Sequence, residues 1–192
     1  IKSLVATFPN IILSVDTFRA QVAKASVENG VAMVNDIAAG LLDDKMLETV
    51  AELKVPYIMM HMRGNPQTMQ SLTDYNDIVK EMIFYFSERI QKARNFGISD
   101  IVIDPGFGFG KTVQENFDIV KRLQELKVIK LPILLGVSRK SSIYKTLGIG
   151  PEDALNGTTV LHTLGLINGA SILRVHDVKE AKQIIQLLPY LQ

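Results

Sequence analysis

The sequence predicts an α/β protein, a (β/α)8 barrel of the TIM type of which about six βα units are present, strands 3–8. Short apolar runs alternate with helical patterns and no antiparallel hairpin signal interrupts them, which favours a parallel sheet. Polar residues finish or follow the six apolar runs: Asp16, Asn35, His61, Asp104, Ser138 and His176. The ends of barrel strands meet at one mouth, whereas an open doubly wound sheet spreads them apart. The barrel is therefore favoured over the open sheet.

The strands are expected where nearly continuous apolar runs indicate burial on both faces. These runs are Ile11–Val15, Val31–Asn35, Tyr57–His61, Ile101–Asp104, Ile133–Gly136 and Ile172–Val175. Helices are expected between and after them, several ending at Gly or beginning at Pro. They are Phe18–Asn29, Asp44–Leu53, Tyr75–Phe96, Gln114–Glu125, Pro151–Asn168 and Val178–Leu188. An eight-stranded barrel needs two more units, so either two units are missing from this chain or Ile1–Pro9 is the tail of an absent one.

Composition narrows the class of protein. The chain has 192 residues, which predicts a single domain over 1–192, with 21 Lys and Arg against 20 Asp and Glu. This balance gives no reason to expect a nucleic-acid or membrane partner. The absence of cysteine excludes thiolate metal sites and cysteine nucleophiles, and no signal segment or membrane-length apolar run is visible. A cytoplasmic location is expected.

The glycine-rich segment Asp104–Lys111, which reads DPGFGFGK, is the strongest local signal. Alternating glycines after a strand let the backbone approach a ligand and adopt positive φ. A Walker A motif would need Gly at Pro105, so an ordinary nucleotide site is rejected. A carboxylate at Asp104 would suit a flat heterocycle with two parallel N–H donors. The alternatives are a tight turn with incidental glycines and an Asp paired with a nearby cation.

Asp16 and Asn35 extend the same pattern to two earlier strand ends. Each alone could be a helix cap, as could Asp36. Together with Asp104, they are more typical of a site that hydrogen-bonds the polar edge of a heterocycle. Met59 and Met60 are interpreted as core, and one of them could pack on a flat ligand. Two histidines at separate strand ends do not define a zinc site, and His162, in mid-helix, is interpreted as packing.

Basic residues follow the last two strands. Lys140 could bond a ring carbonyl, and Ser141 could begin a helix where a carboxylate is favoured; the alternative is a solvated basic turn. Arg174 and His176 share one face of a strand and form a possible anion clamp, at the loops where barrel enzymes often hold phosphate. A core histidine with an Arg–Asp pair is the alternative there.

Six motifs, in this order, resemble the dihydropteroate synthase family, and they cover nearly the whole chain. They are SVDT from Ser14, NDI from Asn35, MHMRGNPQTMQ from Met60, DPGFGFGK from Asp104, GVSRKS from Gly136 and RVHDV from Arg174. The resemblance implies an enzyme that condenses 6-hydroxymethyl-7,8-dihydropterin pyrophosphate with p-aminobenzoate, giving 7,8-dihydropteroate and pyrophosphate.

The resemblance also implies roles for individual residues. The polar edge of the pterin would be hydrogen-bonded by Asp16, Asn35, Asp104 and Lys140. Met60 would pack against the pterin ring. Phe109, Ser138 and Ser141 would line the p-aminobenzoate pocket. Arg174 and His176 would bind the pyrophosphate, and with Lys140 they form the expected catalytic set.

One departure from the family concerns the start of the chain, because nothing matches the family's first two strands. The first of these carries an Asn that helps to bind Mg²⁺, so the metal is an expected cofactor although no metal ligand is expected among these residues. The enzymatic activity of these 192 residues alone is expected to be impaired.

The family further implies a homodimer and a target of sulfonamides. The rivals are a pterin-dependent methyltransferase and a barrel that binds pterin without catalysis.

Overall fold

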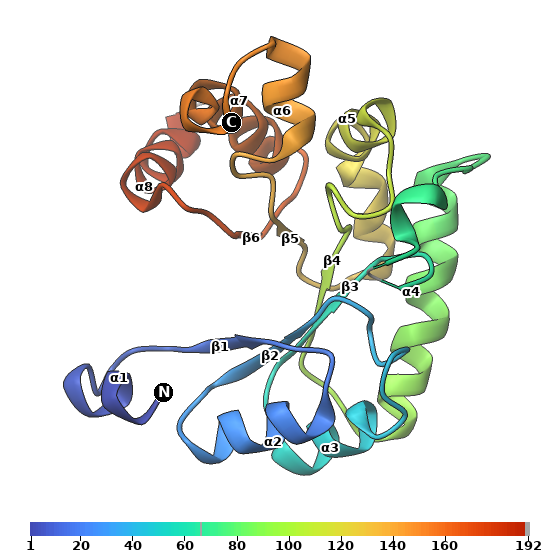
Figure 1. The fold of residues 1–192 in the computed structure, drawn as a ribbon, viewed down its shortest axis with the longest axis vertical. Helices are drawn as coiled ribbons and strands as arrows, with labels where there is room; N and C mark the ends of the chain where they lie inside the picture. The colour runs from blue at the N-terminus through green and yellow to red at the C-terminus, as the bar shows by residue number, and fades with distance from the viewer. Residues whose placement is uncertain (66, 191–192) are drawn as a thin grey trace. The chain divides into compact units, whose positions relative to one another are not determined.

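Figure 1 shows a computed structural model of the protein, which describes residues 1–65 and 67–190. The chain divides into two compact units. The first comprises Ile1–His61 and Phe84–Ile103, and the second Met62–Ile83 and Asp104–Gln192. The single domain expected over 1–192 stays a prediction. Pro66, within the motif that starts at Met60, lies outside the described residues.

The first unit is built on a sheet in which the strands follow the chain order β1-β2-β3-β4. β1 pairs with β2, and β2 with β3, in parallel register. Two helices lie side by side along this sheet (Figure 1). The strands are β1 (Ser14–Asp16), β2 (Met33–Asp36), β3 (Tyr57–Met60) and β4 (Ile101–Asp104), and the two helices are α2 (Ala20–Glu28) and α3 (Met46–Leu53).

The strands form where apolar side chains can be buried on both faces. Val34, Tyr57, Met59 and Ile103 have no exposed surface. The strand expected over Ile11–Val15 is displaced toward the C-terminus, because Ile11 and Ile12 are 39% and 74% exposed and pairing with β2 begins at Ser14. An apolar run without a neighbour to cover it does not become a strand.

The second unit holds the parallel pair β5 (Leu134–Leu135) and β6 (Ile172–Leu173). α7 contacts both α5 and α8 (Figure 1). The helices of this part are α5 (Val113–Lys121), α6 (Ser141–Leu147), α7 (Leu155–Ile167) and α8 (Val178–Leu187), with 3-10 turns η1 (Met69–Ser71), η2 (Leu123–Ile129), η3 (Pro151–Asp153) and η4 (Leu188–Tyr190). The remaining helices are α1 (Lys2–Thr7) and α4 (Ile78–Asn95).

The α/β class is confirmed, but several predicted boundaries are wrong. The helix expected over Gln114–Glu125 is divided into α5 and η2, and the one over Pro151–Asn168 into η3 and α7. A capping box between Thr112 and Glu115 fixes the start of α5. The described strands form two sheets rather than one, so the closed barrel and its count of six units stay predictions.

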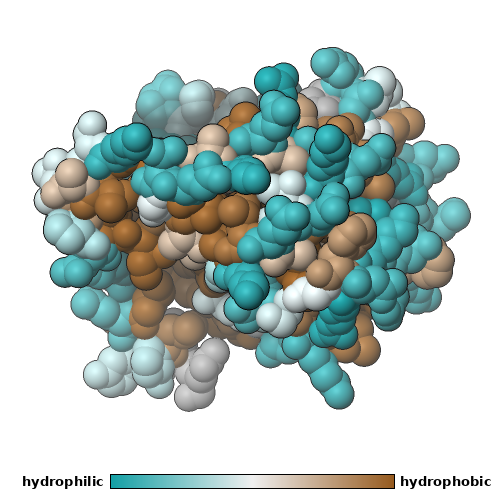
Figure 2. Space-filling view, turned by 90° about the horizontal axis from the view of Figure 1, so that it is seen from below, coloured by the Kyte–Doolittle hydropathy of each residue, from teal (hydrophilic) through white to brown (hydrophobic). Residues whose placement is uncertain are grey.

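The surface seen in Figure 2 is mostly hydrophilic, with brown hydrophobic areas gathered toward its left side. Large apolar side chains are exposed in the N-terminal segment: Ile1, Leu4, Phe8, Ile11 and Ile12. α1 buries none of its residues, so its side chains add nothing to the core of the first unit. Among the described helices, none has the length and hydrophobicity to cross a membrane.

Candidate active site

The first unit brings Asp16 and Asn35 together at neighbouring strand ends. They are register partners in β1 and β2, and the main-chain N–H of Thr17 donates to the Asn35 carbonyl at 2.9 Å. Asn35 is in turn the partner of Ile58. Because alternate residues of a strand face the same side, Met60 lies on this side too. Three residues predicted to contact the pterin therefore share one face of the sheet.

The buried side-chain oxygen of Asn35 has no hydrogen-bond partner among the described residues. The side chain is 9% exposed, and none of the described residues donates a hydrogen bond to its Oδ1. An unsatisfied buried polar group costs about 1–3 kcal/mol. Such a cost is typical of positions where a ligand supplies the missing donor.

The adjacent Asp36 is structural by contrast. Its Oδ1 accepts from the N–H of Ala38 at 2.8 Å, and Oδ2 from the N–H of Gly40 at 2.7 Å and the hydroxyl of Tyr57 at 2.6 Å. Burial raises the pKa of the Asp36 carboxyl, and these hydrogen bonds oppose the shift. Asp36 thus holds the turn after β2 rather than capping a helix.

In the second unit, Asp104 is the buried carboxylate of a cluster with three cationic residues. It is 7% exposed, and its Oδ1 accepts from the N–H of Gly106 at 2.7 Å. Burial raises the pKa of Asp104, and the positive charges of Lys140, Lys111 and Arg174 partly offset this by lowering it. Burial also lowers the pKa of Lys140 to about 8 and that of Lys111 to about 7. A cluster with more cations than anions suits an anionic ligand.

The glycine-rich loop is held by side chains that bond its carbonyl groups. The ammonium of Lys111 donates to the carbonyls of Gly106 and Phe109, both at 2.9 Å, and that of Lys140 donates to the carbonyl of Phe107. The amide oxygen of Asn116 accepts from the N–H of Gly108 at 2.6 Å. Gly106, Gly108 and Gly110 all have positive φ, as expected for alternating glycines.

Lys140 lies across this loop. A Cβ added at Gly108 would lie 2.9 Å from Cδ of Lys140, and the Lys140 ammonium is 4.5 Å from the centroid of the Phe109 ring. Lys140 and Phe109, predicted to contact different parts of the substrates, are thus neighbours. Lys111 and Asn116 were not predicted as site residues. Lys111 was visible as the last residue of the motif, but no sequence signal identified Asn116.

The ends of β5 and β6 also meet. The ring Nδ1 of His176 lies 3.0 Å from Oγ of Ser138, and the main-chain N–H of His176 donates to the same oxygen at 3.2 Å. The main-chain N–H of Arg174 donates to the Leu135 carbonyl at 3.0 Å. Ser141 is the first residue of α6, as expected. These contacts bring Ser138, Arg174 and His176 together at two adjacent strand ends.

The remaining histidines are packed in the interior. His61 is 2% exposed, and its ring meets Tyr85 edge-on at a centroid distance of 4.8 Å. His162 is equally buried in α7, and burial lowers its pKa. Across residues 1–65 and 67–190, no group of three or more His, Asp or Glu side chains could hold a metal ion.

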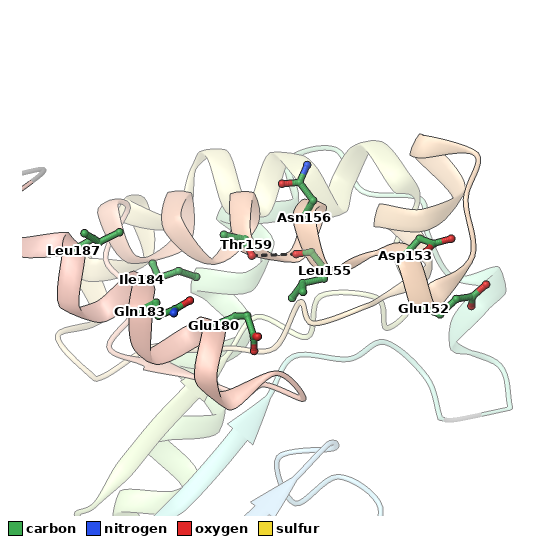
Figure 3. Close-up of a pocket in the computed structure, with 9 residues that line it drawn as sticks. All are labelled: Glu152, Asp153, Leu155, Asn156, Thr159, Glu180, Gln183, Ile184 and Leu187. Carbon is green, nitrogen blue, oxygen red and sulfur yellow. Dashed lines mark hydrogen bonds between the residues drawn. The ribbon is translucent and has the colours of Figure 1, made fainter.

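A cavity of about 610 Å³ lies elsewhere in the second unit, between α7 and α8 (Figure 3). Glu152, Asp153 and Glu180 contribute carboxylates to it, and Ile184 and Leu187 contribute apolar surface. None of the predicted site residues lines this cavity, so it is separate from the candidate active site.

Comparison with known proteins identifies the class. Residues 1–176 match the family model described as pterin binding enzyme, and the chain belongs to this family. The dihydropteroate synthase of Synechocystis is 42% identical over 181 residues, which are 93% of this chain and 63% of that protein. The dihydropteroate synthase of Escherichia coli is 39% identical over 178 residues, 92% of this chain and 63% of the relative. The chain thus spans less than two thirds of the length of these relatives.

The fold agrees with this assignment. The structure of dihydropteroate synthase from Xanthomonas albilineans in complex with 7,8-dihydropteroate is similar with a TM-score of 0.91 and 36% identity, over 100% of this chain and 72% of that one. The chain therefore has the α/β fold of the dihydropteroate synthase structures.

Proposed function

We propose that the protein is a dihydropteroate synthase, which condenses 6-hydroxymethyl-7,8-dihydropterin pyrophosphate with p-aminobenzoate. The observation that carries this proposal is the buried Asp104 carboxylate beside Lys140, Lys111 and Arg174. A carboxylate accepts two parallel N–H donors from an amino-heterocycle, and the surrounding cations suit a diphosphate. The relatives named above, dihydropteroate synthases at 42% and 39% identity, support the same assignment.

In the proposed reaction, the bond between the pterin methylene carbon and the pyrophosphate oxygen breaks, and the arylamine nitrogen bonds to that carbon and loses a proton. Departure of pyrophosphate comes first, because the pterin ring can delocalise the resulting cation. Asp104 and Asn35 bind the polar edge of the pterin, and the negative charge of Asp104 stabilises the ring while it is electron-poor. Lys140 contributes a donor to the ring. The protein acts through position and electrostatics, without a covalent intermediate.

Arg174 and His176 are the proposed stabilisers of charge that develops on pyrophosphate. Contact with Ser138 supports this role for His176, because the hydroxyl orients the imidazole ring. Mg²⁺ stays an expected cofactor, and no step is assigned to it. A homodimer, a cytoplasmic location and sensitivity to sulfonamides likewise stay predictions.

The test is release of pyrophosphate when both substrates are mixed with the protein as its gene encodes it. We expect release to require p-aminobenzoate, and Asp104→Asn and Lys140→Met to lower kcat/KM by about 10–100-fold, since hydrogen bonds to charged groups contribute about 1.5–3 kcal/mol. The exposed Asp44→Asn is the control. Near-normal turnover in both site variants would refute the site assignment.

The same assay separates the rivals. A pterin-dependent methyltransferase would release no pyrophosphate and would not need Arg174 and His176 as an anion clamp. A noncatalytic pterin-binding protein would show calorimetric binding of the pterin without turnover.

A further inference from the structure

Arg139 and Asp177, which have no ligand role in the proposal above, join the two loops that carry the proposed catalytic groups. Arg139 lies between Ser138 and Lys140, and Asp177 follows His176. Nε and Nη2 of Arg139 donate to the two carboxylate oxygens of Asp177, both at 2.9 Å. A guanidinium fork on a carboxylate is directional as well as strong. This ion pair therefore links the loop after β5 to the loop after β6 in a defined orientation.

The rest of the Arg139 donors are also used. Nη1 donates to the carbonyls of Pro151 at 2.9 Å and Glu152 at 2.5 Å, and Glu152 is drawn at the edge of the cavity in Figure 3. The main-chain N–H of Arg139 donates to Oγ1 of the buried Thr158 at 2.9 Å. A lysine could not reproduce this arrangement, because its ammonium lacks the planar fork.

The backbone of Arg139 is held in an unusual conformation, with φ at +51°. Residues other than glycine rarely adopt positive φ, and such strain persists where surrounding contacts impose it. On one side of this residue, the hydroxyl of Ser138 lies 3.0 Å from the His176 ring. On the other side, Lys140 reaches the carbonyl of Phe107. The strained residue thus separates two side chains that have different tasks.

We propose that Arg139 is a positioning residue that, through its fork on Asp177, fixes Lys140 and His176 relative to each other for the reaction. This inference rests on the proposed function, and it assigns Arg139 no contact with the reacting atoms. Misplacement of catalytic groups by about 1 Å can lower a rate by about 100-fold.

Stability and turnover should respond differently to loss of the pair. The side chains of Arg139 and Asp177 are 25% and 21% exposed, and the pKa of Asp177 is lowered chiefly by its hydrogen bonds from Arg139. Partly exposed ion pairs contribute little to the free energy of unfolding. A purely structural pair would change the melting temperature without changing kcat of the folded molecules.

The experiment compares Arg139→Met, Arg139→Lys, Asp177→Asn and the double variant Arg139→Met/Asp177→Asn in the protein as its gene encodes it. Pyrophosphate release is measured per folded molecule. We expect kcat to fall about 10–100-fold in each single variant while KM for p-aminobenzoate changes less than about threefold. Arg139→Lys should recover little, and the double variant should lose no more than Arg139→Met, because the two residues act as one unit.

Arg122 provides a matched control in the same unit. Its Nη1 and Nη2 donate to the two carboxylate oxygens of Asp77 at 3.0 and 3.2 Å, and its Nε and Nη2 donate to Glu125 at 2.8 and 2.9 Å. Arg122→Met therefore breaks two carboxylate pairs away from the proposed site residues. We expect this variant to keep kcat within about twofold, since these partly exposed pairs contact no site residue.

The outcomes separate the two proposals. Arg139 variants that behave like Arg122→Met, or additive losses in the double variant, would overturn the positioning role alone. A wild-type protein without pyrophosphate release would overturn the proposed function, and this inference with it.

Discussion

At the scale of the residue, neighbouring polar side chains in β2 have opposite tasks. Asp36 is saturated by three donors, whereas the buried Oδ1 of Asn35 has none among the described residues. The first arrangement stabilises the fold. The second costs stability and is compensated only when a ligand donates to it. The proposed function thus divides two neighbouring polar residues of one motif between folding and binding.

Substitution of Asn35 should therefore stabilise the protein and weaken binding. We expect Asn35→Leu to raise the free energy of unfolding by about 1 kcal/mol, because it removes an unpaired buried group. Its affinity for the dihydropterin should fall about tenfold or more. Urea denaturation and calorimetry measure the two effects.

Asp36→Asn is the matched comparison. It should lower the free energy of unfolding by about 1–3 kcal/mol, since an amide group would face donors. A destabilised Asn35→Leu that binds pterin normally would show that Asn35 is structural too.

Lys111 gives a prediction about pH. Its folded pKa is about 7, below the ordinary 10.5, so between these values the unfolded chain holds a proton that the folded protein has released. The free energy of unfolding should therefore rise with pH from 7 to 9.5, by up to about 1.4 kcal/mol per pH unit from this residue. Lys140, with a pKa of about 8, acts in the same direction.

Lys111→Met should flatten this dependence, as measured by urea denaturation at pH 7 and pH 9.5. An unchanged slope would mean that the folded protein keeps Lys111 protonated throughout this range.

At the scale of the element, the glycine-rich loop combines backbone freedom with close approach. Gly108 and Gly148 both have positive φ, at +84° and +66°. A Cβ at Gly108 would meet Lys140, whereas one at Gly148 would meet nothing within 4 Å. Two glycines with the same backbone requirement thus differ in what a side chain would disturb.

This difference predicts that only one of the two substitutions changes turnover. Gly108→Ala and Gly148→Ala should each lose about 1–2 kcal/mol of stability from the backbone. Only Gly108→Ala should also lose turnover, by about tenfold or more, because it displaces Lys140 from its place over the loop. Thermal denaturation and pyrophosphate release test this. Equal turnover in the two variants would contradict the role given to Lys140.

At the scale of the whole molecule, the two units contribute different chemistry. The first unit supplies the acceptors Asp16 and Asn35, and the second supplies Asp104 with its cations. The proposed function gives each set a role in binding the pterin. Substitutions in either unit are therefore expected to lower the affinity for the dihydropterin.

Thermal stabilisation by the dihydropterin pyrophosphate tests this requirement. A ligand that binds only the folded state at 100 times its Kd stabilises by about 2.7 kcal/mol. We expect Asn35→Leu and Asp104→Asn each to reduce the rise in Tm, with Asp44→Asn as the unchanged control. A rise in Tm that is lost in only one of the two site variants would remove the other residue from the pterin site.

Much of the fold could be predicted because periodicity is local. β4 has the predicted bounds, and the α/β class follows from alternating apolar runs and helical patterns. Boundaries failed where a local pattern depended on a neighbour, as at Ile11 and Ile12, or where a 3-10 turn joined a helix, as at Pro151–Asp153. The short helix α6 was anticipated only by its first residue, Ser141.

The sequence alone determined the order of strands and helices and the polar residues at the strand ends, since both depend on spacing along the chain. Only the tertiary structure decided which of those residues have partners. Arg139 and Asp177 are 38 residues apart, and whether a described residue donates to the Asn35 acceptor depends on what surrounds it. Hydrogen bonds between distant residues depend on how the elements pack, which no local pattern specifies.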